Sequence, residues 1–210
     1  MSEIDEGFVR IATTLISVSD KRGVVDFAKF LKTRYDTKII STGGTAKVLR
    51  DAGIHVEDVS EITGFPECLG GRVKTMHPKL MGGVLYRRHH RDDEESVNVL
   101  RMEPIDLVVV NLYPFEKTIQ KPGVTFDEAI EEIDIGGPTL LRSAAKNHRF
   151  VTVASKIEHY DLIRNAMIDN RGPTTSRQLR HHLAAEAIRH TSEYDKVIAD
   201  YLESTQHGTA

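Results

Sequence analysis

The chain has 210 residues, of which 40% are hydrophobic and 28% are charged, and its formal net charge is -3. These values are typical of one large soluble domain, or of one domain with an appendage, and they exclude the basic footprint of a nucleic-acid-binding protein. No apolar run approaches the roughly 20 residues that a membrane-spanning helix needs. Residues 1–7 are acidic and polar, unlike a signal peptide. The single cysteine, Cys68, cannot form an internal disulfide, so we expect a reducing, cytoplasmic location.

Apolar runs alternate with amphipathic helical patterns along most of the chain. The runs predict five strands, at Ile11–Ser17, Lys38–Ser41, His55–Val59, Leu107–Leu112 and Phe150–Ala154. The fourth run is unbroken and β-branched, which suits a parallel strand buried on both faces. Because the intervening helices favour right-handed βαβ crossovers, we predict an α/β fold with a doubly wound, mostly parallel sheet and helices on both faces. Ligands of such folds bind beyond the carboxyl ends of the strands.

Two strand-to-helix junctions are suited to holding a phosphate. Thr42-Gly43-Gly44-Thr45 joins the second strand to a helix start, and Ser17–Lys21 joins the first strand to the helical pattern Val24–Leu31. Glycines let backbone N–H groups approach an anion, and a helix N-terminus adds the positive end of its dipole. The glycine turn matches neither known phosphate-loop pattern, and the alternative is a simple turn. The candidate phosphate-binding residues are Ser17, Ser19, Lys21, Thr42, Gly43, Gly44 and Thr45.

A long loop rich in glycine and basic residues, Gly64–Gly83, is expected to run into a short helix. Within it, Arg72 and Lys74 are separated by one residue and can clamp an anionic substrate. Lys74 can also donate to a carbonyl oxygen that becomes negative. The alternative is a solvated basic loop.

Further polar groups follow at the ends of later elements. Asn111 and Tyr113 stand where the fourth strand stops, and the tyrosine is as well suited to packing as to chemistry. Asp134 ends a helical pattern, Phe126–Ile133, and precedes two glycines and a new helix with Pro138 in its first turn. It is either an N-cap or a carboxylate that accepts a proton.

Lys146 lies near the far end of that new helix, which we expect to reach about Asn147. A helix rises 1.5 Å per residue, so Lys146 and Asp134 serve one site only if the site spans the helix or crosses a subunit boundary. The alternative for Lys146 is a cation that stabilises a helix C-terminus.

Beyond Ala154 the pattern predicts helices at Ile157–Asp169 and from about Thr174 to Leu202. The apolar stripe of the second helix contains Tyr194 and Tyr201, and it indicates core packing rather than a cofactor site. We therefore expect a flexible N-terminus at residues 1–9, a core at 10–155, a helical extension at 156–203 and a flexible tail at 204–210.

Three other features carry no predicted chemistry. The run Arg87–Asp93 lacks the spacing of a metal-ligand set and is interpreted as a solvated charge run. His181-His182 has no partner signature, and Cys68 has no recognisable base nearby. We expect neither a metal nor a cofactor.

Seven motifs in order carry a resemblance to a known family. They are Ser17-Val18-Ser19-Asp20-Lys21, Ser41-Thr42-Gly43-Gly44-Thr45, Thr63-Gly64-Phe65-Pro66-Glu67, Gly70-Gly71-Arg72-Val73-Lys74-Thr75-Met76-His77-Pro78, Asn111-Leu112-Tyr113-Pro114-Phe115, Asp134-Ile135-Gly136-Gly137 and Ala144-Ala145-Lys146-Asn147-His148. From about Ile11 to Leu202, the chain resembles the N-terminal inosine monophosphate cyclohydrolase domain of bifunctional purine biosynthesis enzymes.

The resemblance implies a methylglyoxal-synthase-like fold and the last step of purine nucleotide synthesis. The carboxamide nitrogen of formylated aminoimidazole carboxamide ribotide would attack the formyl carbon of the same molecule, and water would leave to give inosine monophosphate. The resemblance also implies a homodimer, while the composition indicates no nucleic acid or membrane partner.

The resemblance also assigns residues. Those that would hold or orient the substrate are Ser17, Ser19, Lys21, Thr42, Gly43, Gly44, Thr45, Arg72, Val73, Thr75, Asn111, Leu112, Ile135, Gly136 and Gly137. The catalytic residues would be Lys74, Tyr113, Asp134 and Lys146, with acid and base roles left open among them.

Some features depart from the family pattern. Thr42 and Met76 stand where serine and leucine are common. The family's usual chain continues into a second domain that transfers a formyl group from a folate, so we expect no transformylase domain here. Two other functions compete on the same fold: a methylglyoxal-synthase-type lyase, which would not need Asn111–Phe115 or the Arg72–Thr75 loop, and a non-catalytic nucleotide sensor, which would not need four ionisable groups.

Overall fold

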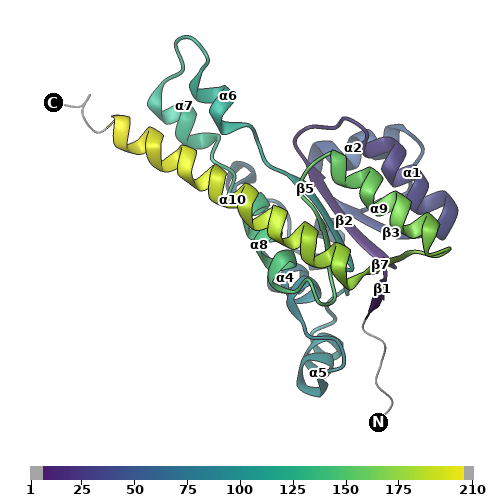
Figure 1. Cartoon of the computed structure of the whole chain (residues 1–210). Coiled ribbons are helices and arrows are strands. Elements are labelled where there is room, and N and C mark those ends of the chain that lie inside the picture. The colour runs from purple at the N-terminus through teal and green to yellow at the C-terminus, as the bar shows by residue number, and fades with distance from the viewer. Residues whose placement is uncertain (1–6, 206–210) are drawn as a thin grey trace.

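A five-stranded parallel sheet lies at the centre of the computed structural model, which describes residues 7–205 (Figure 1). The strands are β2 (Thr13–Val18), β3 (Lys38–Ser41), β4 (Glu57–Asp58), β5 (Leu107–Asn111) and β6 (Thr152–Ala154), in the spatial order β4-β3-β2-β5-β6. Each neighbouring pair is parallel. Val108 and Val109 are fully buried, as expected for a strand covered on both faces. The predicted parallel sheet is therefore confirmed.

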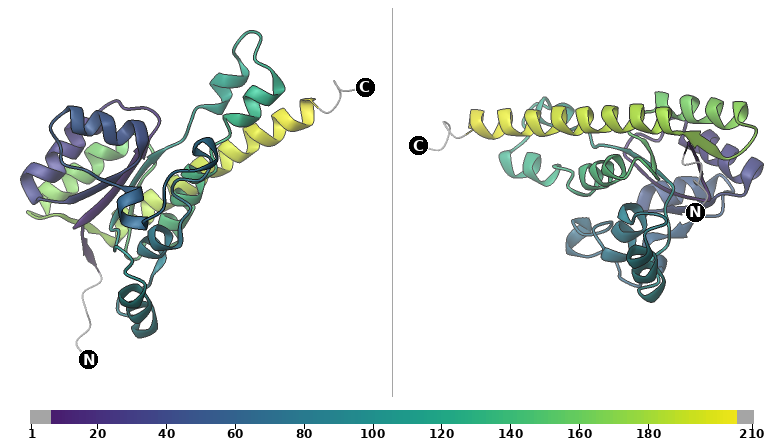
Figure 2. Two further views of the ribbon diagram at one scale, coloured as in Figure 1. Left: turned by 180° about the vertical axis from the view of Figure 1, so that it is seen from behind. Right: turned by 60° about the horizontal axis from the view of Figure 1, so that its bottom comes forward.

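Helices cover both faces of the sheet, which confirms the doubly wound architecture. One layer holds α1 (Val24–Tyr35), α2 (Gly43–Asp51) and α9 (Glu158–Asp169), and the other holds α4 (Pro78–Leu85), α8 (Gly136–Lys146) and α10 (Arg177–Thr205) (Figures 1 and 2). The chain builds β3 and β4 on one side of β2 and then returns to build β5 and β6 on the other. The carboxyl ends of β2 and β5 therefore form a topological switch point, where such sheets bind ligands.

Shorter elements connect these layers. They are α3 (Val59–Thr63), the 3₁₀ turn η1 (Leu69–Gly71), α5 (Arg91–Val99), α6 (Phe115–Ile119) and α7 (Phe126–Glu131). The pair α6 and α7 lies beside the outer half of α10 (Figure 2), where the ring of Tyr201 contacts Phe115 at a centroid distance of 5.6 Å and Phe126 at 6.1 Å. These aromatic contacts attach the end of the long helix to the segment that follows β5.

The structure adds a second sheet that the sequence pattern did not predict. β1 (Phe8–Arg10) pairs antiparallel with β7 (Thr174–Ser176), and α10 begins only at Arg177. Residues 8 and 9 were expected to be flexible, and Thr174 was expected to be helical; pairing between two short segments far apart in sequence explains both differences. Of the other residues expected to be flexible, 204 and 205 belong to α10, and 1–6 and 206–210 lie outside the described residues.

The helical extension also differs from the expectation. α9 packs in the layer of α1, where the rings of Phe27 and Tyr160 stack with centroids 4.9 Å apart. Of these two helices, it is α10 that extends beyond the sheet, and it continues to Thr205, past the expected end at Leu202 (Figure 1). Within the described residues, no helix has both the length and the apolar character needed to cross a membrane.

Candidate functional site

Asn111, the last residue of β5, holds the loop that follows β2. Its Oδ1 accepts hydrogen bonds from the backbone N–H groups of Ser19 (2.6 Å) and Asp20 (2.9 Å), and its Nδ2 donates to the Asp20 carbonyl at 2.9 Å. The side-chain amide is thus occupied by this loop. Its role in the structure is to fix the loop at the switch point between the two strands.

The two candidate phosphate turns are joined directly. Ser17 Oγ lies 2.9 Å from Thr42 Oγ1, and Thr45 Oγ1 accepts from Val18 N and donates to Val18 O at 3.2 and 3.0 Å. Gly43 and Gly44 are exposed at the N-terminus of α2, and no described residue accepts from their N–H groups. The two turns therefore place the free N–H groups of Gly43 and Gly44 beside the hydroxyls of Ser17 and Thr42, whereas the buried Thr45 hydroxyl is engaged with the Val18 backbone.

Lys21 is folded onto its own loop. Its Nζ donates to the carbonyls of Val18 and Ser19, the latter at 3.1 Å, and burial lowers the pKa of this ammonium. The positive charge is therefore held beside the phosphate turns at the carboxyl end of β2.

The basic loop divides between the site and the surface. Lys74 Nζ lies 2.8 Å from Glu67 Oε2 and 3.3 Å from the point where a Cβ atom on Gly43 would stand. The exposed Arg72 instead pairs with Glu131 on α7, with Nε 3.2 Å from Oε2. The structure thus places Lys74 against the phosphate turn, while the Arg72 guanidinium is engaged away from it.

Asp134 lies in a cradle of backbone donors at the start of α8. Its Oδ1 accepts from Gly137 N at 2.8 Å, and its own N–H donates to the hydroxyl of Tyr194 at 2.8 Å. Burial raises the pKa of Asp134, although the N–H groups of Gly137, Tyr113 and Gly136 oppose that shift. Ile135 is the N-cap residue of α8, so Asp134 stands one position before the cap, where its carboxylate accepts from a first-turn N–H and its pKa is perturbed by burial.

Gly136 and Gly137 let the turn that carries Asp134 approach its neighbours closely. A Cβ atom on Gly136 would stand 2.8 Å from Thr75 Oγ1, and one on Gly137 would stand 2.8 Å from Leu112 Cδ2. Lys74 lies against the phosphate turn, and the next residue, Thr75, lies against the turn that carries Asp134. The basic loop therefore links the two halves of the site.

Lys146 stands apart from this group. It is exposed in the last turn of the 11-residue helix α8, whose rise separates it from the Asp134 end by about 15 Å. Among the described residues, no hydrogen bond or ion pair joins Lys146 to another candidate.

The remaining candidates lie on the loops that carry the others. Val73 and Tyr113 are half-buried, and Ile135 is 55% exposed.

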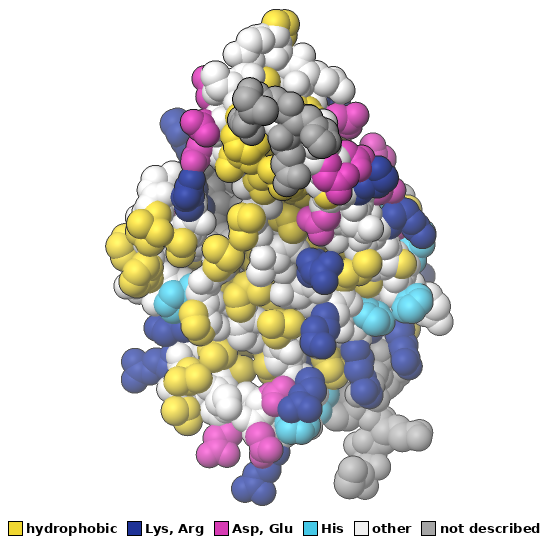
Figure 3. All heavy atoms as spheres, turned by 90° about the vertical axis from the view of Figure 1, so that its left-hand side faces the viewer, with side chains coloured by type: hydrophobic (Ala, Val, Ile, Leu, Met, Phe, Trp, Pro, Cys, Tyr) yellow, Lys and Arg dark blue, Asp and Glu magenta, His cyan; other side chains and the backbone are white. Residues whose placement is uncertain are grey.

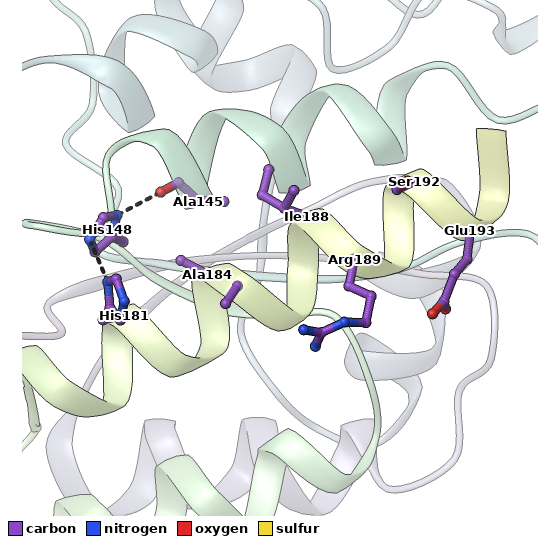
Figure 4. Close-up of a pocket in the computed structure, with 9 residues that line it drawn as sticks. Ala145, His148, His181, Ala184, Ile188, Arg189, Ser192 and Glu193 are labelled. Atoms are coloured by element: carbon purple, nitrogen blue, oxygen red, sulfur yellow. Dashed lines mark hydrogen bonds between the residues drawn. The ribbon is translucent and has the colours of Figure 1, made fainter. Parts of the chain in front are cut away.

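A shallow groove runs between α8 and α10 (Figure 4). His181 Nδ1 lies 3.3 Å from His148 Nε2, and His148 Nδ1 donates to the Ala145 carbonyl at 2.9 Å. His181 therefore has a partner that the sequence did not reveal. Ala184 and Ile188 contribute apolar surface to the same groove.

The remaining features behave as surface structure. Arg87 and His90 pair with Asp93 at 2.7 and 3.2 Å. Residues 7–205 hold no group of three or more His, Cys, Asp or Glu side chains arranged for a metal ion. Cys68 is half-buried and forms a backbone bridge with Val73.

Family models match nearly the whole chain. The MGS-like domain matches residues 23–139, and the AICARFT/IMPCHase bienzyme model matches residues 144–210. Together these two matches include every candidate site residue except Ser17, Ser19 and Lys21.

Similar proteins agree with this. Proteins named bifunctional purine biosynthesis protein PurH are 52% identical over 192 residues in Trichodesmium erythraeum and 54% identical over 188 residues in Listeria welshimeri. These alignments cover 91% and 90% of this chain but 37% and 36% of the relatives, so the chain spans little more than a third of their length. The crystal structure of ForH superposes with a TM-score of 0.81 at 33% identity and covers 92% of this chain and 97% of its own.

Proposed function

The chain belongs to the MGS-like domain family, and on that premise we propose that it is an inosine monophosphate cyclohydrolase of purine biosynthesis. The observation that carries this proposal is the buried acid Asp134, joined through the loop of Lys74 and Thr75 to an exposed phosphate turn. The match to the bienzyme model and the PurH relatives support the same activity.

The ribotide phosphate would bind at the joined turns. The free N–H groups of Gly43 and Gly44 point out of a helix N-terminus, where anions are favoured. The hydroxyls of Thr42 and Ser17 lie beside them, 2.9 Å apart. This arrangement supports a phosphate-bearing substrate.

The reaction is an intramolecular ring closure, so holding the amide and formyl groups in attack geometry supplies much of the acceleration. Asp134 is proposed to accept the proton from the carboxamide nitrogen, a role suited to a carboxyl group whose pKa is raised by burial. Lys74 is proposed to give a proton to the formyl oxygen as the N–C bond forms, which leaves a hydroxyl on the new ring carbon. In the dehydration that follows, this hydroxyl would take the proton held by Asp134 and leave as water, while the formamido nitrogen returns its proton to Lys74 and the C=N bond forms. Tyr113, whose backbone N–H faces Asp134, would assist proton movement.

Lys146 requires a different explanation, because it lies at the other end of α8 from Asp134. We propose a homodimer in which Lys146 of one subunit reaches the site of its partner. The neighbouring groove between α8 and α10 exposes Ile188, which is 43% accessible. The face on which α10 ends also carries many hydrophobic side chains, with Lys and Arg around them (Figure 3).

The cytoplasm is the compartment that we propose, because purine nucleotide synthesis is a metabolic function and the single cysteine suits a reducing environment.

The test is direct conversion. Purified chain is mixed with formylated aminoimidazole carboxamide ribotide, and inosine monophosphate formation is followed by absorbance, with Lys74→Ala in parallel. Fast conversion that the variant loses is the expected result. Tight nucleotide binding without conversion would instead favour a sensor, and release of inorganic phosphate from a triose phosphate would favour a lyase.

A further inference from the structure

One hydrogen bond connects the long C-terminal helix to the acid of the site. The hydroxyl of Tyr194, on α10, accepts from the backbone N–H of Asp134 at 2.8 Å, across 60 residues of sequence. The sequence pattern placed Tyr194 in an apolar stripe typical of core packing. Its hydroxyl therefore has a specific partner that the stripe does not explain.

Tyr194 contacts the segment that follows β5 as well as the backbone of Asp134. Its side chain is only 8% exposed, and its ring meets that of Phe115 edge to face with centroids 6.4 Å apart. Phe115 begins α6, directly after the segment Asn111–Pro114 that leaves the switch point. The packed ring thus sets the position of the hydroxyl, and the hydroxyl sets the position of the Asp134 backbone.

We propose that Tyr194 is a positioning residue for Asp134, so that α10 forms part of the framework of the site. This inference rests on the proposed function, in which Asp134 accepts the substrate proton. The carboxylate direction depends on the cradle of N–H groups at Gly136 and Gly137. That cradle can orient the carboxylate only if the Asp134 backbone keeps its position at the start of α8, and the bond from the Asp134 N–H to Tyr194 holds that backbone.

Burial and the nearby carboxylates keep the Tyr194 hydroxyl neutral. Burial raises the pKa of Tyr194 to about 12, and the carboxylates of Asp134, Asp195 and Glu132 act in the same direction, against the bond from the Asp134 N–H. Tyr194 therefore stays protonated across the working pH range. Any change in the pH profile of a Tyr194 variant must then come from another group.

The test compares Tyr194→Phe with Tyr201→Phe. Tyr201 lies two turns further along α10 and packs on the same Phe115 ring, but its hydroxyl makes no hydrogen bond within the described residues. For Tyr194→Phe we expect kcat to fall about tenfold with KM within about twofold. A misplacement of 1 Å can cost about 100-fold, and we expect the loss of this one bond to move Asp134 by less than that. The acid limb of the pH–rate profile should move to lower pH as Asp134 becomes more hydrated. Tyr201→Phe should change neither quantity.

An unchanged kcat and acid limb in Tyr194→Phe, even with a lower melting temperature, would reduce Tyr194 to core packing and overturn the inference. A second measurement keeps the test independent of turnover. Carbon-13 NMR titration of the Asp134 carboxyl group, assigned with Asp134→Asn, should show a raised pKa that falls in Tyr194→Phe. If the unmodified chain does not convert the ribotide, the proposed function fails, and the titration alone decides whether Tyr194 positions Asp134.

Discussion

The ammonium nitrogen of Lys74 lies 3.3 Å from the point where a Cβ atom on Gly43 would stand. The basic loop and the phosphate turn therefore meet at a residue where a side chain on the turn would crowd Lys74. Gly43 also has a positive φ of 42°, a conformation that L side chains rarely adopt. Its neighbour Gly44 has open space around its Cβ position. Two adjacent glycines in one turn thus have different reasons to be there.

This difference predicts unequal effects of alanine. Gly43→Ala should lower the free energy of unfolding by about 1–2 kcal/mol through backbone strain. It should also lower kcat/KM about tenfold or more by displacing Lys74. Gly44→Ala is the matched control and should leave stability unchanged. Urea denaturation and steady-state kinetics measure both effects, and equal losses in the two variants would contradict the proposed contact.

Asp134 predicts a pH dependence whose sign follows from its burial. Because burial raises the pKa of the folded state, the contribution of Asp134 to stability is fully present below the pKa of the unfolded chain. It is lost as the pH rises through the folded pKa. Asp134→Asn should therefore gain stability relative to the unmodified chain at pH 7, and this advantage should shrink as the pH falls toward 3.

The same substitution should lower turnover by about 100-fold or more, because asparagine cannot accept the proton. Thermal unfolding between pH 3 and pH 8, combined with the conversion assay, measures both predictions. A variant that is destabilised at pH 7 but keeps its turnover would refute the base role and the burial argument together.

Arg180 predicts a structural loss on α10. It is fully buried, and its guanidinium donates to the carbonyls of His148 and Arg149, each at 3.0 Å, and to that of Thr175. Arg180→Met should cost about 3 kcal/mol or more, since it leaves buried carbonyls without donors. Arg189→Met, which removes only an exposed pair with Glu186, should change stability little. Chemical denaturation of the two variants tests this contrast.

The sequence predicted the elements whose signals are local. The apolar run ending at Val110 predicted a buried parallel strand, and the glycines at 43 and 44 predicted a turn that exposes donors, because both depend on neighbouring residues. The pairing of β1 with β7, the partner of His181 and the bond from Asp134 to Tyr194 depend on contacts between distant segments. Nothing in the local pattern distinguishes Tyr194 from Tyr201, and arginine is rarely buried, so Arg180 carried no signal either.

The position of Lys146 yields a test by subunit mixing. If Lys146 acts in the partner's site, Lys74→Ala and Lys146→Ala should each be inactive alone, because every site in either homodimer lacks one lysine. A mixed dimer contains one complete site, formed by Lys74 of one chain and Lys146 of the other. Random reassociation of equal amounts in a symmetric dimer should therefore restore roughly a quarter of the unmodified activity.

The control for this experiment mixes Lys74→Ala with Asp134→Asn. Thr75 and Gly136 bring the loops of these two residues together within one chain. A mixed dimer would then have one variant residue in each site, and no activity should return. Recovery in the control but not with Lys146→Ala would place the subunit boundary between Lys74 and Asp134 instead. No recovery in either mixture, with dimers confirmed by sedimentation, would leave Lys146 a role within its own chain, as a cation that stabilises the C-terminus of α8.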